Sequence, residues 1–166
     1  QFTIENHRSI KNSAVISFAA SKDTSFRENL LHPDKKKTLL PAIAIYGANA
    51  AGKSNVLHAM KTMKNMIVGD AAKLLKGQKL PWEPFGGNAN PTAFETVFMY
   101  HGVRYAYGFS FDENRIHTEY LYYWPNGREA MIFSRDHGVY EFRENVNEQT
   151  ALSNRTPDNK LYLVSS

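Results

Sequence analysis

The sequence lacks cysteine altogether among its 166 residues. This absence excludes disulfide bonds, thiolate metal sites and cysteine nucleophiles. Long apolar runs are missing too: none approaches the roughly 18 residues that a membrane-spanning helix needs. The first ten residues also lack the apolar stretch of a signal peptide. We therefore expect a soluble, cytoplasmic protein that makes no contact with a membrane.

What the chain does contain is typical of a globular protein. Hydrophobic residues make up 42% of it and charged residues 22%, and its length corresponds to one domain or a large piece of one at about 150 residues per domain. Charge is unevenly placed: residues 1–80 carry 13 Lys and Arg against 5 Asp and Glu, whereas residues 81–166 carry 7 against 11. The basic first half is suited to binding an anion.

Residues 1–77 have the pattern of a strand–loop–helix core. Short alternating segments around residues 2–4 and 14–18 predict an opening pair of strands, and residues 21–38 predict a loop. The apolar run 39–46 is typical of a strand buried on both faces of a parallel sheet. After a glycine-rich turn at 47–52, apolar residues at spacings of three and four predict an amphipathic helix over 53–68, followed by a short turn at 70–76.

The second half has a different period. Residues 78–93 are rich in proline and glycine and predict a connecting loop. Over 94–142 the apolar period is two, which predicts an antiparallel meander of about five strands. In its third strand, the alternation places Ile116, Thr118, Tyr120, Tyr122 and Trp124 on one face. Residues 143–166 combine a polar, irregular stretch with an apolar element at 161–164 that we expect the chain end to cut off.

The sharpest motif is a phosphate-binding loop. Gly47 to Ser54 read G-A-N-A-A-G-K-S and match G-x-x-x-x-G-K-[ST] between the expected strand and helix. Small residues let the backbone amides curl around phosphate oxygens at the positive end of the helix. The ammonium group of Lys53 can reach the terminal phosphates, and the Ser54 hydroxyl can bind a bridging Mg²⁺.

The nucleotide predicted by these residues is ATP. A guanine reader needs Asn-Lys-x-Asp, and the one Asn-Lys pair, Asn159-Lys160, is not followed by that aspartate. A catalytic ATPase also needs an aspartate and a glutamate at the end of a second buried strand. Asp112-Glu113 imitates this pair, but Asp-Glu-Asn-Arg is good turn chemistry in a half-exposed meander, and we interpret it as a turn.

Several motifs together resemble a known family. Residues 4–12 (IENHRSIKN), residues 45–57 around the loop, and residues 159–165 (NKLYLVS) resemble the ABC-type ATPases of the SMC, RecF and OLD clade. Within this clade the chain is most similar to the OLD-like and Rlo-type ATP-binding proteins of bacterial anti-phage systems. The resemblance covers nearly the whole chain. It implies an α/β fold of the P-loop NTPase type, an ABC-type ATPase lobe with an antiparallel β meander.

The resemblance also implies a mechanism. In that clade two ATPase heads dimerise head to tail, with ATP between them, so a second copy of the chain and a nuclease or toxin effector are the expected partners. Lys53 would be catalytic and Ser54 would bind Mg²⁺. ATP would contact Arg8, Gly47, Asn49, Ala50, Ala51, Gly52, Lys53, Ser54 and Asn55. His7 departs from the family, which usually has an aromatic residue there.

Other features leave alternatives open. The signature segment, the magnesium aspartate, the catalytic glutamate and the switch histidine of the clade are expected beyond Ser166, so this part alone would bind ATP but hardly hydrolyse it. The run 35–37 (KKK) or the aromatic meander could contact DNA or RNA, which would fit a nucleic-acid-binding module. A P-loop kinase is a third alternative. The six histidines show no metal-binding spacing.

Overall fold

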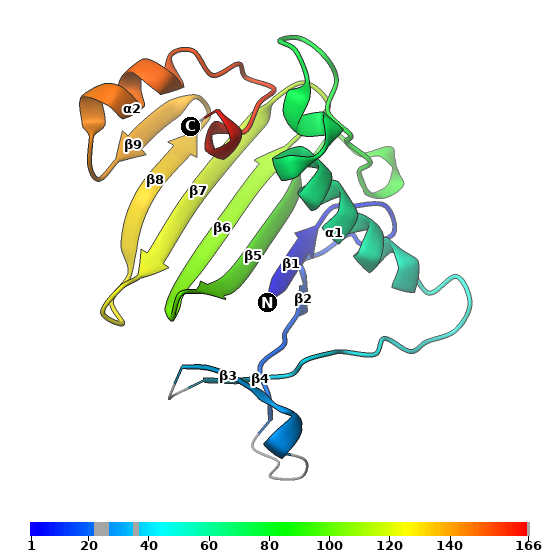
Figure 1. The fold of residues 1–166 in the computed structure, drawn as a ribbon. Coiled ribbons are helices and arrows are strands. Elements are labelled where there is room, and N and C mark those ends of the chain that lie inside the picture. Colours follow the sequence, from blue (N-terminus) through cyan, green and yellow to red (C-terminus); the bar gives the residue numbers. More distant parts are fainter. Residues whose placement is uncertain (22–26, 35–36, 166) are drawn as a thin grey trace.

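The fold is built on one large antiparallel sheet with helices against it (Figure 1). A computed structural model describes residues 1–21, 27–34 and 37–165. Within these residues the seven-stranded sheet has the order β2-β1-β5-β6-β7-β8-β9. Its strands are β1 (Phe2–Glu5), β2 (Ala14–Ile16), β5 (Thr92–Tyr100), β6 (Val103–Phe111), β7 (Ile116–Trp124), β8 (Ala130–Asp136) and β9 (Val139–Phe142).

The opening strand pair extends the meander. Both predicted units form, and β1 joins them, because it pairs with β2 on one side and with β5 on the other. Phe2 lies opposite Ile16 and Thr96 in the two ladders. The sequence predicted a pair and a meander as separate units, and pairing between strands about 90 residues apart leaves no local pattern that could have linked them.

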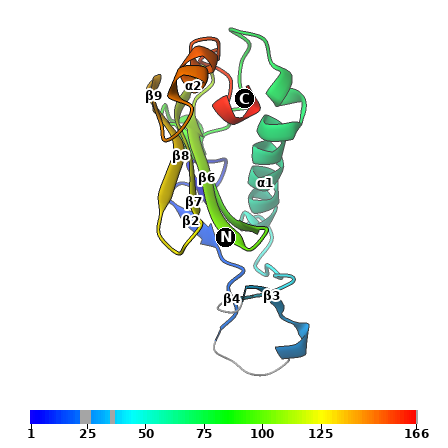
Figure 2. The same cartoon turned by 60° about the vertical axis from the view of Figure 1, so that its left-hand side comes forward.

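Helix α1 (Lys53–Val68) lies along one face of this sheet, as Figure 2 shows with the sheet seen nearly edge-on. The helix spans the predicted residues and ends at Gly69, whose amide donates to the Asn65 carbonyl at 3.0 Å. Its buried residues are Ala59, Thr62, Met63 and Met66. They join a core that contains Phe2, Ile4, Phe94, Tyr107, Phe109, Phe111, Ile116 and Phe133. Six of these eight core residues are aromatic, and burial of such large rings contributes strongly to the stability of a fold.

A bulge corrects the predicted faces of β7. Ile116 lies opposite Phe111 and is fully buried, whereas Thr118 lies opposite Ser110 on the other face. The register shifts between these two pairs, so Ile116 and the following alternate residues of β7 do not share a face. A bulge adds one residue to one strand, and simple alternation cannot reveal it.

The buried strand predicted over 39–46 is wrong. Of the predicted residues, Leu39 alone lies in a strand, as the last residue of β4 (Lys37–Leu39). Residues 41–50 are exposed and carry no strand. An apolar run forms a buried strand only when neighbouring strands accept and donate its backbone hydrogen bonds on both sides. Among the described residues, no strand flanks residues 40–46 in this way.

Two regions predicted as irregular contain structure. In the predicted loop 21–38, β3 (Leu31–Asp34) pairs with β4 (Lys37–Leu39). The Leu40 amide, just after β4, donates to the Phe18 carbonyl at 2.8 Å and so connects this pair to the segment after β2. Residues 146–153 form helix α2 (Val146–Ser153). Its largely polar sequence has no apolar stripe, so periodicity could not detect it.

Short 3-10 turns complete the described part of the chain. They span Arg27–Asn29, Asp70–Lys73, Phe85–Gly87 and Tyr162–Val164. The last of these turns is the apolar element predicted near 161–164. In the described ranges we find no helix both long enough and apolar enough to cross a bilayer.

Candidate functional site

The predicted phosphate loop folds back on itself just before α1. The Lys53 ammonium donates to the carbonyl oxygens of Gly47 and Ala48 at 2.8 and 2.5 Å. Ala50 and Gly52 have left-handed backbones, with φ of 62° and 86°. Two positive φ angles within three residues curl the chain, so the loop is closed around the lysine rather than stretched out.

The amides of this loop are available to an acceptor. Across residues 48–53 of the described chain, the Ala51 amide alone donates to another backbone group, the Ala48 carbonyl at 3.3 Å. A shallow cavity of about 220 Å³ is lined by residues 50–55. It lies at the N-terminus of a 16-residue helix, where unpaired amides and the helix dipole favour an anion. Ser54, in the first turn, is exposed.

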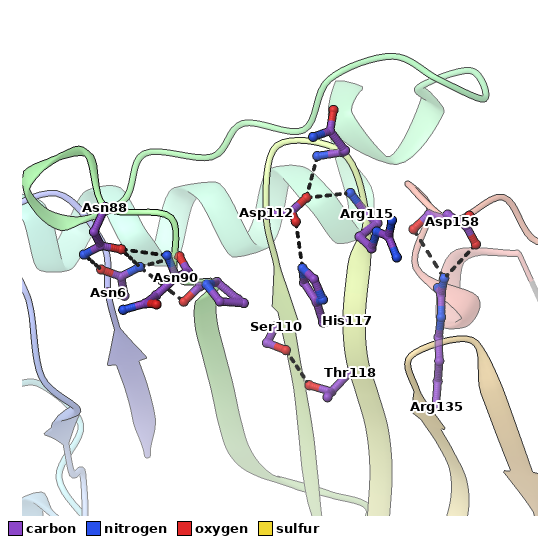
Figure 3. A network of polar contacts seen from close by, with 12 residues as sticks. Asn6, Asn88, Asn90, Ser110, Asp112, Arg115, His117, Thr118, Arg135 and Asp158 are labelled. Carbon is purple, nitrogen blue, oxygen red and sulfur yellow. Dashed lines mark hydrogen bonds and ion pairs between the residues drawn. The ribbon is translucent and has the colours of Figure 1, made fainter.

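A tight turn at residues 6–10, between β1 and β2, packs beside this loop. Asn6 adopts a left-handed backbone (φ 49°) and is nearly fully buried. Its side-chain amide pairs with that of Asn88 at 3.0 and 2.8 Å, and also donates to the Asn90 carbonyl at 2.6 Å (Figure 3). These bonds fix the turn to the loop at residues 83–91.

The same turn touches the start of α1. The Asn55 side-chain amide donates to the Ser9 hydroxyl at 2.7 Å, so this predicted nucleotide contact is directed at the turn. A Cβ added to Gly52 would lie 2.7 Å from the Ser9 Oγ. The second glycine of the motif is therefore favoured by the close approach of Ser9 as well as by its own positive φ. Sequence reasoning did not assign Ser9 a role at the site.

Arg8 forms an ion pair within the turn region. Its guanidinium donates to the Glu83 carboxylate, and its backbone amide donates to the Glu83 carbonyl at 2.8 Å. The hydrogen bond from the Arg8 guanidinium lowers the pKa of the Glu83 carboxyl group. Arg8 was predicted to approach nucleotide phosphates, and it adjoins Ser9, which contacts the loop. No spacing in the sequence links Arg8 to a residue 75 positions away, so Glu83 was missed.

Two histidines connect the turn to the helix. His7 is fully buried, and its Nε2 lies 3.1 Å from the Nδ1 of His58 on α1, with the rings stacked. The rings of His7 and Phe94 also pack edge to face, so His7 packs here as an aromatic residue would. Burial, and then the neighbouring His58, lower the pKa of His7 to about 4. Burial also lowers the pKa of His58. Both rings are therefore neutral near pH 7, and a hydrogen bond between them requires at least one to be neutral.

The acidic pair Asp112-Glu113 forms a turn, as interpreted from the sequence. The Asp112 carboxylate accepts from the amides of Asn114 and Arg115 at 2.7 and 3.0 Å (Figure 3). It also contacts His117 Nε2 at 2.8 Å. This carboxylate caps the β6–β7 connection and does not take part in the loop site.

The basic run at 35–37 lies mostly outside the described residues, which include Lys37 alone. Lys37 is half-buried in β4, and its ammonium lies 3.8 Å from the sulfur of Met99. In the described ranges, no group of three or more His, Asp or Glu side chains is arranged to hold a metal ion.

Comparison with known families gives a match over residues 42–152. The family is described as "AAA domain, putative AbiEii toxin, Type IV TA system". The match begins just before the phosphate loop and extends through the meander into α2. The chain belongs to this family. Its membership supports an AAA or ABC-type ATPase that binds nucleotide. No curated protein matches the chain.

The loop residues fit the nucleotide that such an ATPase domain implies. Free amides, a helix N-terminus and one ammonium group converge on the cavity at residues 50–55. The Lys53 ammonium donates to two carbonyl oxygens of its own loop, which phosphate oxygens can replace. Ser54 offers the hydroxyl that a nucleotide-bound Mg²⁺ commonly uses, and the metal would neutralise phosphate charge.

Proposed function

We propose that this chain is the ATP-binding lobe of an ABC-type ATPase related to the OLD-like and Rlo-type proteins. The observation that carries the proposal is the closed loop at 47–54, with its free amides, at the start of a helix packed on a β meander. The family match over the same residues supports it. Phosphate binding would use the loop amides, with Lys53 and Ser54 at the terminal phosphates and Mg²⁺.

The role of ATP binding would be to favour a dimer. A head-to-tail pair of lobes places each nucleotide between two chains, so ATP contacts the second chain only in the closed state. A ligand with extra contacts in one state shifts the population toward it. We propose that this closure gates a nuclease or toxin effector in anti-phage defence. The family description, which names a type IV toxin–antitoxin system, supports a toxin-related role.

The proposal is tested by titrating a fluorescent ATP analogue with Mg²⁺ against wild type and Lys53→Ala. We expect the variant to lose at least about tenfold in affinity, because a charge-assisted contact to phosphate is removed. Lys64→Ala is the matched control, since it removes an exposed lysine from the same helix. Equal binding by wild type and Lys53→Ala would reject the proposal. Single-stranded DNA binding that survives Lys53→Ala would favour a nucleic-acid module instead.

A further inference from the structure

The Arg8–Glu83 ion pair joins the turn at 6–10 to the connection 78–91. Arg8 belongs to the turn at 6–10. The residue that follows it in this turn, Ser9, lies against Gly52 and accepts a hydrogen bond from the Asn55 side chain. Glu83 belongs to the connection 78–91, which the same turn holds through Asn6 and Asn88. The turn is therefore in contact with the nucleotide loop on one side and with the connection on the other.

The pair has the features of an exchangeable contact. The two side chains are 36% and 45% exposed, so solvent and small anions reach them. Glu83 is the one carboxylate that the described structure pairs with Arg8. An arginine fork binds a phosphate with the same planar geometry that it uses for a carboxylate. The Arg8 amide donates to the Glu83 carbonyl at 2.8 Å, which holds the Arg8 backbone in place, so exchange of the guanidinium's partner requires a change of side-chain rotamer alone.

We propose that Glu83 is a competitor for Arg8 that holds its guanidinium until a nucleotide phosphate displaces the carboxylate. This inference rests on the proposed function, since it needs a nucleotide at the loop. Nucleotide binding would then change the contacts of the connection 78–91. When the Arg8 guanidinium moves to the phosphate, this connection loses its ion pair with the turn. Exposed ion pairs are weak, so the competition is small enough for a nucleotide to win.

The surroundings limit how the exchange can take place. His7 and His58 flank the pair and are neutral near pH 7, so neither offers Glu83 a substitute cation. The backbone bond from the Arg8 amide to the Glu83 carbonyl, at 2.8 Å, is independent of the side chains. Displacement of the carboxylate would therefore loosen the connection without detaching it.

The test is Glu83→Gln, which removes the competing charge and keeps the shape of the side chain. We expect it to bind MgATP about two- to fivefold more tightly than wild type, the range that an exposed ion pair can supply. The gain should disappear when Arg8→Ala is added. Glu113→Gln is the matched control, because Glu113 pairs with Lys79 of the same connection at 2.8 Å and lies in the β6–β7 turn.

Trp82 gives a second measurement, since it precedes Glu83 and is one of two tryptophans in the chain. In a Trp124→Phe background, MgATP should change Trp82 emission, and Glu83→Gln should show part of that change without ATP.

The outcomes separate the two proposals. If Lys53-dependent ATP binding is present but Glu83→Gln behaves as Glu113→Gln, the proposed competition between Glu83 and phosphate is wrong, and the proposal of nucleotide binding stands. If wild type and Lys53→Ala bind ATP equally, both proposals fail.

Discussion

At the scale of single residues, the site depends on how closely the turn at 6–10 approaches the nucleotide loop. Ser9 reaches so near to Gly52 that a Cβ at position 52 would force the Ser9 hydroxyl to shift. The loop conformation is thereby fixed from outside by a residue 43 positions earlier in the chain. The motif alone explains Gly52 by backbone freedom, and the structure adds a packing reason.

Gly52→Ala should separate these two reasons. A left-handed alanine costs about 1 to 2 kcal/mol, and the new Cβ would also meet the Ser9 Oγ at 2.7 Å. Gly77→Ala is the control, because Gly77 has a similar φ of 83° with nothing within 4 Å of an added Cβ. We expect Gly52→Ala to lower the unfolding free energy more than Gly77→Ala does in urea titrations.

Adding Ser9→Ala to Gly52→Ala should recover the excess loss. Without the hydroxyl, the nearest Ser9 atom lies 3.8 Å from the added Cβ, an ordinary contact. The two glycine variants would then be equally destabilised. Equal losses before Ser9→Ala is added would show that packing against the turn does not constrain the loop.

His7 should make stability depend on pH. Folded His7 has a pKa of about 4, whereas the unfolded residue titrates near 6.5. Between these values the unfolded chain binds more protons, so stability is full above pH 6.5 and falls as the pH is lowered to about 4. The loss from this residue is at most about 3 kcal/mol. His7→Phe keeps a ring against Phe94 and should flatten most of this slope in unfolding measured from pH 7 to pH 4; an unchanged slope would assign it to other groups.

At the scale of elements, local pattern was sufficient where an element's own residues determine it. The bounds of α1 and the presence of five meander strands follow from periods of 3.6 and two, which burial on one face imposes. The element predicted over 39–46 failed because a strand depends on its neighbours, and α2 was missed because it has no apolar stripe. Patterns report burial, and these two segments are largely exposed in the described structure.

The site divides in the same way. Residues 47–54 and the start of α1 were predicted because the motif is contiguous. Ser9, His58 and Glu83 were not, because each acts through a partner distant in sequence. His7 was noted only as a departure from the aromatic residue usual in the family, and its partner on α1 explains how the turn accommodates it.

A buried carboxylate ties the last described element to the sheet. Glu119 of β7 accepts from Tyr107 OH at 2.9 Å and from the amides of Tyr162 and Leu163 at 2.6 and 3.0 Å. Burial raises the pKa of Glu119, while these three bonds and the charge of Arg135 lower it. The Glu119 carboxylate thus caps the 3-10 turn at Tyr162–Val164. The alternation of residues in β7 could not have predicted this capping contact.

At the scale of the whole molecule, α1 has apolar residues on two sides and one layer of structure against it. The sheet covers one side, whereas Leu57 and Val68 on the helix are 66% and 68% exposed. Tyr46, in the apolar run before the loop, is 90% exposed. A helix that is apolar on two sides is typical of packing between two layers. Among the described residues, the sheet is the one layer present.

This arrangement predicts a hydrogen-exchange pattern across the molecule. The amides of residues 42–50 are exposed and donate to no backbone group in the described chain, so they should exchange within seconds. Those of β6, paired on both sides, should exchange far more slowly. MgATP should slow exchange over residues 48–53, because phosphate oxygens would accept from these amides, and Lys53→Ala should abolish that slowing. Protection of residues 42–46 without nucleotide would instead mean that the apolar run pairs with another strand in solution, as a second copy of the chain could provide, and dilution would then remove it.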